Sequence, residues 1–267
     1  MPTVNEVNNF IFSIASVEMK ADFDNVGFLV GRGESNVSKI LVCLDITNDV
    51  ISEAHETGVE LIVAHHPLFF SLKSVTDSDT TGKKIIRLLT GNISAICMHT
   101  NLDAAFGGIN DALAATIGIS GDGMNTELLD EEGCLSTGEA YSYGRVGFLK
   151  KPCSLSEYLD ILKNSLGVNG LRYYDAGREV NKVGIVSGSG GDKFDCAVMH
   201  GCDTFVSADI KYHVFLEAKE VGINIVDAGH YSTENVISSV LVSILSEAFP
   251  GVDVVESKTQ NQVVSFY

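Results

Sequence analysis

Short apolar runs alternate with amphipathic segments along the whole chain. Seven runs rich in β-branched residues predict strands, at 39–46, 60–65, 93–99, 145–150, 182–188, 204–209 and 224–229. Apolar residues at helical spacing predict helices between them, at 5–16, 48–57, 81–90, 108–117, 155–166, 191–201, 210–221 and 234–249. Runs this apolar, separated by helices, are typical of buried parallel strands in βαβ units. We therefore predict an α/β fold with mainly parallel sheets that are covered by helices.

One segment breaks this alternation. Residues 118–138 (GISGDGMNTELLDEEGCLSTG) are rich in glycine and acidic side chains, which is typical of a loop. The chain has 267 residues, enough for one large domain or two modest ones. The segment is therefore our candidate for a domain boundary.

The composition excludes several classes of protein. With 18 basic and 35 acidic residues the net charge is −17, and the chain has no basic stripe of the kind that a dedicated nucleic-acid binder needs. The sequence shows no signal peptide and no apolar run of about 18 residues. The six cysteines include no C-x-x-C pair, so we expect reduced thiols. These features predict a soluble, cytoplasmic protein without membrane contact.

Three of the predicted strands end in residues that bind metals. His65 and His66 stand side by side at the first of these ends, and Pro67 keeps His66 extended. Adjacent imidazoles there can serve two metal ions, or one ion and a substrate. Two solvated histidines in a turn are the alternative.

The other two strand ends carry carboxylates. Asp103 follows the run at 93–99 and precedes a helical segment, so taken alone it is a candidate helix cap as well as a ligand. His99 is a candidate catalytic residue that orients a ligand. His230 and Glu234 are four residues apart, so they share one helix face and can bind one ion. An ordinary surface pair is the alternative.

Taken together, these residues predict a metal centre at the carboxyl ends of the strands, the edge where α/β sheets bind ligands. The predicted ligands are His65, His66, Asp103, His230 and Glu234. Nitrogen and oxygen donors without a thiolate suit Zn²⁺, Fe²⁺ or Mn²⁺. With one bridging carboxylate, five side chains can hold two divalent ions. Coordination positions left for water are typical of catalytic sites.

Further polar residues lie near these strand ends. Lys211, Tyr212 and His213 follow the run at 204–209, and Lys211 and His213 are candidate catalytic residues that bind substrate or relay protons. An ordinary helix start is the alternative. The SGSGG segment at 187–191 is either a phosphate cradle or a tight strand-to-helix connection.

Asp24 and Asn25 stand in a DNVG segment. Asn and Gly favour turn geometry, so we interpret the segment first as a structural turn. A role in lining the predicted cavity is the second interpretation.

The motifs DNVG, AHHP, HTNLD, SADIKYH and DAGHYSTE, in this order, resemble the Nif-three-like family, the GTP cyclohydrolase 1 type 2 homologues. The resemblance spans nearly the whole chain, with Phe23 where members often carry Trp. It implies a dinuclear metal site built from the same five ligands. It also implies two α/β domains: residues 1–125 with 225–267 carry the metal site, and residues 126–224 are inserted. The family forms rings, commonly homohexamers.

Two functions follow as hypotheses. The first is a metal-dependent hydrolase that acts on GTP, a related nucleotide or another small molecule through a metal-activated water, as a cyclohydrolase does. Since the net charge repels nucleotides, the metals and Lys73, Lys193 or Lys211 would have to outweigh it locally. The second hypothesis is a non-catalytic, ring-forming metal-binding scaffold or regulatory protein. Open coordination positions favour the first, whereas the acidic surface and the lack of a nucleotide motif favour the second.

Overall fold

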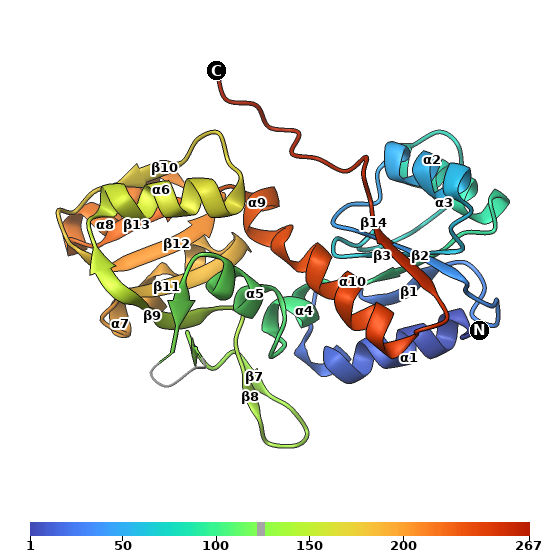
Figure 1. Cartoon of the computed structure of the whole chain (residues 1–267), viewed down its shortest axis with the longest axis horizontal. Coiled ribbons are helices and arrows are strands. Elements are labelled where there is room, and N and C mark those ends of the chain that lie inside the picture. The colour runs from blue at the N-terminus through green and yellow to red at the C-terminus, as the bar shows by residue number, and fades with distance from the viewer. Residues whose placement is uncertain (122–125) are drawn as a thin grey trace. The chain divides into compact units, whose positions relative to one another are not determined.

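The structure is a computed structural model that describes residues 1–121 and 126–267. The chain forms two compact units, whose helices and strands are shown in Figure 1. Unit 1 comprises Met1–Leu102 and Ser238–Asn261, and unit 2 comprises Asp103–Ile237 and Gln262–Tyr267.

The chain passes between the two units three times: within α4 (Thr100–Ala104), within α10 (Val236–Ala248) and after Asn261. The predicted boundary at residue 125 lies outside the described residues. The predicted domains, 1–125 with 225–267 and 126–224, stay a prediction.

Unit 1 contains a five-stranded sheet in the order β1-β4-β3-β2-β14. Its strands are β1 (Gly27–Val30), β2 (Lys39–Cys43), β3 (Leu61–Ala64), β4 (Ser94–Cys97) and β14 (Asp253–Glu256). β14, β2, β3 and β4 run parallel, and β1 is an antiparallel edge. The three runs predicted as parallel strands in this part of the chain are confirmed. β1 and β14 were not predicted; each is an edge strand of 4 residues, and its apolar stretch, FLV or VV, is shorter than those of the predicted runs.

Helices cover the sheet of unit 1. They include α1 (Val4–Ile14), the short helix η1 (Val17–Met19), α2 (Asn48–Thr57) and α3 (Thr80–Thr90). Local sequence explains where they begin: Thr3 and Glu6 form a capping box for α1, and the Thr47 hydroxyl caps α2. The apolar residues of α2 and α3 pack on β2, β3 and β4 in one buried core.

Unit 2 contains a mixed sheet in the order β10-β13-β12-β11-β9-β5. Its strands are β5 (Ile119–Ser120), β9 (Arg145–Cys153), β10 (Arg172–Tyr174), β11 (Val180–Ser189), β12 (Thr204–Ala208) and β13 (Asn224–Asp227). Only β11, β12 and β13 run parallel to one another. The run at 145–150 was wrongly predicted as a parallel strand, since β9 is antiparallel to β11. A strand buried on both faces shows the same apolar run in either direction.

The described part of 118–138 contains only very short strands, as expected for a loop. β6 (Glu127–Leu128) pairs with β9, and β7 (Gly133–Cys134) forms a small hairpin with β8 (Ala140–Tyr141).

Helices cover both faces of the unit 2 sheet. They are α5 (Ile109–Thr116), α6 (Leu155–Leu166), η2 (Gly191–Lys193), α7 (Phe194–Met199), α8 (Tyr212–Val221) and α9 (His230–Glu234). Successive strand residues point to opposite faces: Val206 and Val226 pack with α5 and α6, whereas Phe205 and Ile225 pack with α7 and α8. The predicted α/β fold is thus confirmed, as two mixed sheets covered by helices (Figure 1).

Two further observations concern the cysteines and the helices. All six cysteines are free thiols, and Cys43 and Cys97 are buried in the sheet of unit 1. Within residues 1–121 and 126–267, every helix is too short or too polar to cross a membrane.

Candidate metal centre

The first cluster of predicted site residues lies in unit 1 and is formed by three histidines. Ala64 and Cys97 are paired at the carboxyl ends of β3 and β4, so the residues that follow them emerge side by side. The ring centroid of His65 lies 4.8 Å from that of His66 and 5.1 Å from that of His99. Each imidazole offers a nitrogen within 4.8 Å of the other two, close enough to share a metal ion.

Each of these imidazoles has an oxygen acceptor at Nδ1. The acceptors, all at 2.8 Å, are the Met98 carbonyl for His65, the Asp45 carboxylate for His66 and the Asp24 carboxylate for His99. Because these oxygens only accept hydrogen bonds, Nδ1 carries a proton, and Nε2 is the nitrogen that can bind a metal ion. Metal-binding histidines are typically oriented in this way by an outer partner.

Asp24 organises the side of the cluster at His99. Its carboxylate is fully buried and also accepts from the backbone N–H of Thr100 at 3.0 Å. Burial alone would raise the pKa of Asp24, but hydrogen bonds from His99 and Thr100 outweigh burial and lower the pKa to about 2. The turn lies just before the DNVG segment, at 21–24, where Asp24 N–H donates to the Ala21 carbonyl, and Gly27 already begins β1. The interpretation of DNVG as a structural turn is therefore wrong, because Asp24 instead holds His99.

The second cluster lies in unit 2, on the single turn of α9. His230 Nε2 and Glu234 Oε2 are 3.1 Å apart, which confirms the predicted shared helix face. His230 Nδ1 lies 2.8 Å from Asp209 Oδ2, so its Nδ1 faces an oxygen acceptor, as it does in each histidine of the unit 1 cluster. Glu234 is buried against Gly188, where an added Cβ would lie 2.1 Å from Glu234 Oε1.

Asp45 and Asp209 are site residues that the sequence reasoning missed. Both follow a strand end closely, after β2 and β12 respectively. Asp209 also adopts a left-handed backbone conformation with φ of 49°, which Asp tolerates better than most residues. The sequence signal that could have identified them is a carboxylate just after a buried strand.

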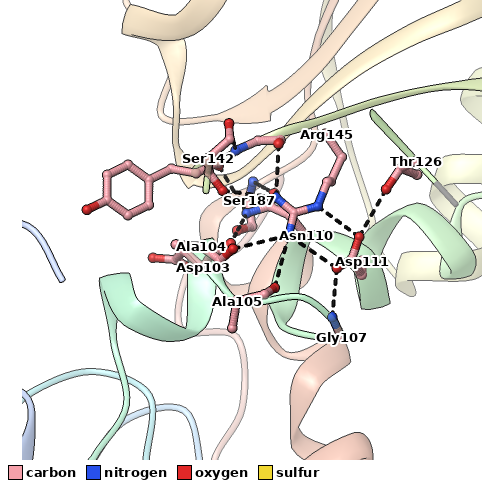
Figure 2. A network of polar contacts seen from close by, with 12 residues as sticks. Asp103, Ala104, Ala105, Gly107, Asn110, Asp111, Thr126, Ser142, Arg145 and Ser187 are labelled. Atoms are coloured by element: carbon pink, nitrogen blue, oxygen red, sulfur yellow. Dashed lines mark hydrogen bonds and ion pairs between the residues drawn. The ribbon is translucent and has the colours of Figure 1, made fainter. Parts of the chain in front are cut away.

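Asp103 lies inside α4 and is half-buried. The next helix, α5, begins after Gly108 and has no side-chain cap. Asp103 therefore does not cap α5, which leaves a ligand role open to it. Its backbone carbonyl accepts a hydrogen bond from Asn110 at 3.0 Å (Figure 2).

The donor set fits divalent metal ions. Four imidazoles have Nδ1 bonded to oxygen, and Glu234 adds a buried carboxylate beside His230. Imidazole and carboxylate suit Zn²⁺, Fe²⁺ and Mn²⁺ alike. The three histidines of unit 1 thus form a group that could hold a metal ion, and His230 and Glu234 of unit 2 offer two more ligands of the same chemistry.

Comparison with known proteins identifies the family to which the chain belongs. The family model for Duf34/NIF3 (NGG1p interacting factor 3) matches residues 2–262. The chain belongs to the Duf34/NIF3 family.

Relatives and solved structures agree with this assignment. The NIF3 chain is 42% identical over 234 residues to a GTP cyclohydrolase 1 type 2 homolog of Clostridium perfringens, with 86% of each chain covered. It is 32% identical to a homolog of the same description from Lactococcus lactis, covering 94% of this chain and 93% of the relative. A Staphylococcus aureus hypothetical protein of known structure, SA1388, superposes with a TM-score of 0.91 at 26% identity over 99% of both chains. A Bacillus cereus protein related to NIF3 shares the fold, with a TM-score of 0.90 at 23% identity over 100% of this chain and 99% of that one.

The SGSGG segment of this NIF3 chain is a strand-to-helix connection and not a phosphate cradle. Its backbone N–H groups donate to side chains of unit 2: Ser187 to Asn110 at 2.8 Å, Gly188 to Thr233 at 3.0 Å and Gly190 to Ser207 at 3.0 Å. These groups are not available to an anion. What the glycine at 188 provides is room for the Glu234 carboxylate.

The basic residues considered for substrate binding differ in their surroundings. Lys211 and His213 are exposed at the start of α8, and Lys73 is exposed in unit 1. Lys193 instead forms ion pairs with Asp130, at 2.7 Å, and with Glu132. Burial lowers the pKa of Lys193, but these two partners outweigh burial and raise it. Lys193 is therefore a structural residue and is withdrawn as a candidate.

An exposed aromatic pair stands beside the histidines of unit 1. Phe23 is 68% exposed and Phe70 is 55% exposed, and their ring centroids are 6.0 Å apart. Phe70 in turn lies 5.9 Å from His99. Asn25 holds this arrangement by donating to the Phe69 carbonyl at 2.9 Å.

Proposed function

We propose that this NIF3 protein is a dinuclear metal-dependent hydrolase that acts on GTP or a related nucleotide. The proposed ligands of two divalent ions, Zn²⁺, Fe²⁺ or Mn²⁺, are His65, His66, Asp103, His230 and Glu234. The observation that carries the proposal is the shared orientation of the imidazoles. In His65, His66 and His230, an oxygen acceptor lies 2.8 Å from Nδ1, so Nε2 is the nitrogen that would bind an ion.

Bound ions would supply Lewis-acid activation of a water molecule and of the bond that it attacks. The protein's own residues orient the reactants and exchange protons. His99 is a proposed catalytic residue because its ring is held by the ionised Asp24, which stabilises the protonated imidazole after it accepts a proton. Lys211 and His213 are the other proposed catalytic residues, since both are exposed and can bind phosphate or relay a proton.

Two features support a nucleotide-like substrate. The relative from Clostridium perfringens is described as a GTP cyclohydrolase 1 type 2 homolog. In addition, the exposed rings of Phe23 and Phe70 beside His99 suit a flat heterocycle, since stacking of a base on an aromatic side chain contributes about 1–3 kcal/mol. In a cyclohydrolase reaction on such a substrate, water would attack C8 of the purine and open the ring.

A non-catalytic metal-binding scaffold is the second candidate function. One observation favours it: the SGSGG segment binds its own unit rather than a phosphate. The proposed partners are otherwise a small-molecule substrate and further copies of this chain in a hexameric ring. A cytoplasmic location stays a prediction.

Turnover of GTP separates the two candidates. Wild-type protein loaded with each of the three metals is assayed beside His66→Ala and Glu234→Ala, with Lys163→Ala, exposed on α6, as the control. A hydrolase gives metal-dependent ring opening that the first two variants lose and the control keeps. Binding of metal without turnover on GTP or other nucleotides would favour the scaffold, and turnover by metal-free protein would contradict metal catalysis.

A further inference from the structure

Asn110 connects the segment that carries Asp103 with the end of β11, which packs against Glu234. It lies in the first turn of α5 and is fully buried. Its side-chain Nδ2 donates to the carbonyls of Asp103 and Tyr143, both at 3.0 Å. Its Oδ1 accepts from the N–H of Ser187 at 2.8 Å. Figure 2 shows this amide between Asp103 on one side and Ser187 on the other.

The Ser187 side of this link leads to Glu234. Gly188, the next residue, donates its N–H to the Thr233 hydroxyl at 3.0 Å. The same glycine leaves the space that the Glu234 carboxylate fills. A shift of the end of β11 at 187–188 would therefore move it against Glu234 directly.

The Asp103 side is held further by Arg145. This guanidinium is fully buried and donates to the carbonyls of Ala104 at 3.2 Å and Ala105 at 2.9 Å. It is held in turn by Asp111, with Nε 2.9 Å from Oδ1 (Figure 2). Three successive carbonyls, from Asp103 to Ala105, thus accept hydrogen bonds from the side chains of Asn110 and Arg145.

Neither Asn110 nor Arg145 suits a ligand role. A guanidinium has no acceptor atom, and both ends of the Asn110 amide are bonded to the backbone. We propose that Asn110 is a positioning residue that sets the placement of Asp103 relative to Glu234 and thereby the affinity of the protein for metal. This inference rests on the proposed metal site and deepens it.

The competing explanation is that Asn110 supports only the fold, and the chain offers a matched control for it. Asn224 is also fully buried in unit 2 and also makes three hydrogen bonds. Its Nδ2 donates to Arg178 O at 3.1 Å and to Thr204 Oγ1 at 3.2 Å, and its Oδ1 accepts from Ala176 N–H at 3.0 Å. It begins β13, at the end of that strand opposite to α9.

The test compares Asn110→Ala with Asn224→Ala in the full chain. Melting temperature is measured with chelator present, and the dissociation constant for the metal that wild-type protein carries is measured by chelator competition. We expect both variants to melt earlier than wild type. We expect only Asn110→Ala to weaken metal binding, by about 10–100-fold, as loss of an outer partner of a metal site does. Asn110→Ser, which leaves a hydroxyl in the pocket, serves if the alanine variant does not fold.

The outcomes separate this inference from the proposed function. Wild-type protein that binds metal, with equal affinities in the Asn110 and Asn224 variants, would overturn the positioning role and leave the metal site intact. Wild-type protein that binds no metal would overturn both. Weakened binding in the Asn110 variant alone supports both.

Discussion

The two clusters of candidate ligands are built in different ways. In unit 1, His65 and His99 follow adjacent parallel strands, and the Asp24 carboxylate that holds His99 is fully buried. In unit 2, His230 and Glu234 come from one short helix, and the Asp209 carboxylate that holds His230 is 59% exposed. The first cluster is held by the sheet, whereas the second relies on Gly188, at the end of β11, and on Asn110.

This difference has a general consequence for how each cluster responds to substitution. A carboxylate buried at a strand end serves the fold and the site together, so its loss costs stability. A ligand on a short helix depends on the segment packed beside it, which for Glu234 is Gly188. Substitution of the carboxylate that holds an imidazole should therefore lower stability in unit 1, where it is buried, and mainly metal affinity in unit 2, where it is exposed.

The largest expected effect comes from Gly188→Ala. The new Cβ would lie 2.1 Å from Glu234 Oε1, and φ at this position is +58°. We expect loss of metal from the Glu234 cluster together with destabilisation of about 2 kcal/mol or more, from left-handed strain and the clash. Metal content and urea unfolding measure the two effects.

Gly201→Ala is the matched control for that substitution. Gly201 also lies in unit 2 with φ of +68°, but an added Cβ would contact nothing within 4 Å. The free energy of unfolding of this variant should fall by about 1 kcal/mol through backbone strain alone, and the variant should keep its metal. Equal metal loss in both variants would mean that strain, not the space beside Glu234, matters.

A smaller effect is expected for Asp24→Asn in unit 1. His99 and Thr100 donate to different oxygens of the Asp24 carboxylate. In the asparagine variant one of these oxygens becomes an NH₂ group, which cannot accept a hydrogen bond and would face the donor. We expect destabilisation of about 2 kcal/mol at neutral pH in metal-free protein. Asp22→Asn, which removes the same charge from an exposed position two residues away, should change stability by less than about 0.5 kcal/mol.

The pH dependence sharpens the Asp24 prediction. Its pKa is lowered from an ordinary value of 3.8 to about 2 in the folded protein. A carboxylate with a lowered folded pKa stabilises the protein above the unfolded pKa, and this contribution is lost as the pH falls through the folded value. The gap in unfolding free energy between wild type and Asp24→Asn should be constant above pH 4 and shrink between 4 and 2. A gap that widens on acidification would contradict this.

The smallest effect on folding is expected for Asp209→Asn. Asp209 is exposed and left-handed, and Asn adopts that conformation readily. Stability in chelator should change by less than about 0.5 kcal/mol. Metal affinity should fall because His230 loses a charged partner. A stability loss as large as that of Asp24→Asn would remove the contrast between the clusters.

Much of this arrangement could be predicted from the sequence. The apolar runs gave the parallel strands of unit 1, and polar residues at their ends gave His65, His66 and His99. The spacing of His230 and Glu234 gave their shared helix face. These predictions depend on local periodicity, which the chain itself displays.

The features that could not be predicted from the sequence depend on contacts between distant segments. The direction of β9 is set by pairing with β11, and an apolar run is the same in both directions. Asp24 meets His99 across 75 positions of sequence, and Asn110 meets Ser187 across 77. The glycines at 187–191 resemble an anion cradle in sequence, and only their N–H partners show that they are a tight connection.

The most direct test of the central claim is the metal content per chain of protein purified without added metal or chelator. We predict about two divalent ions per wild-type chain, and loss of one or both in Asp103→Ala. Protein that contains no metal, and takes up none from Zn²⁺, Fe²⁺ or Mn²⁺, would contradict the proposed metal centre.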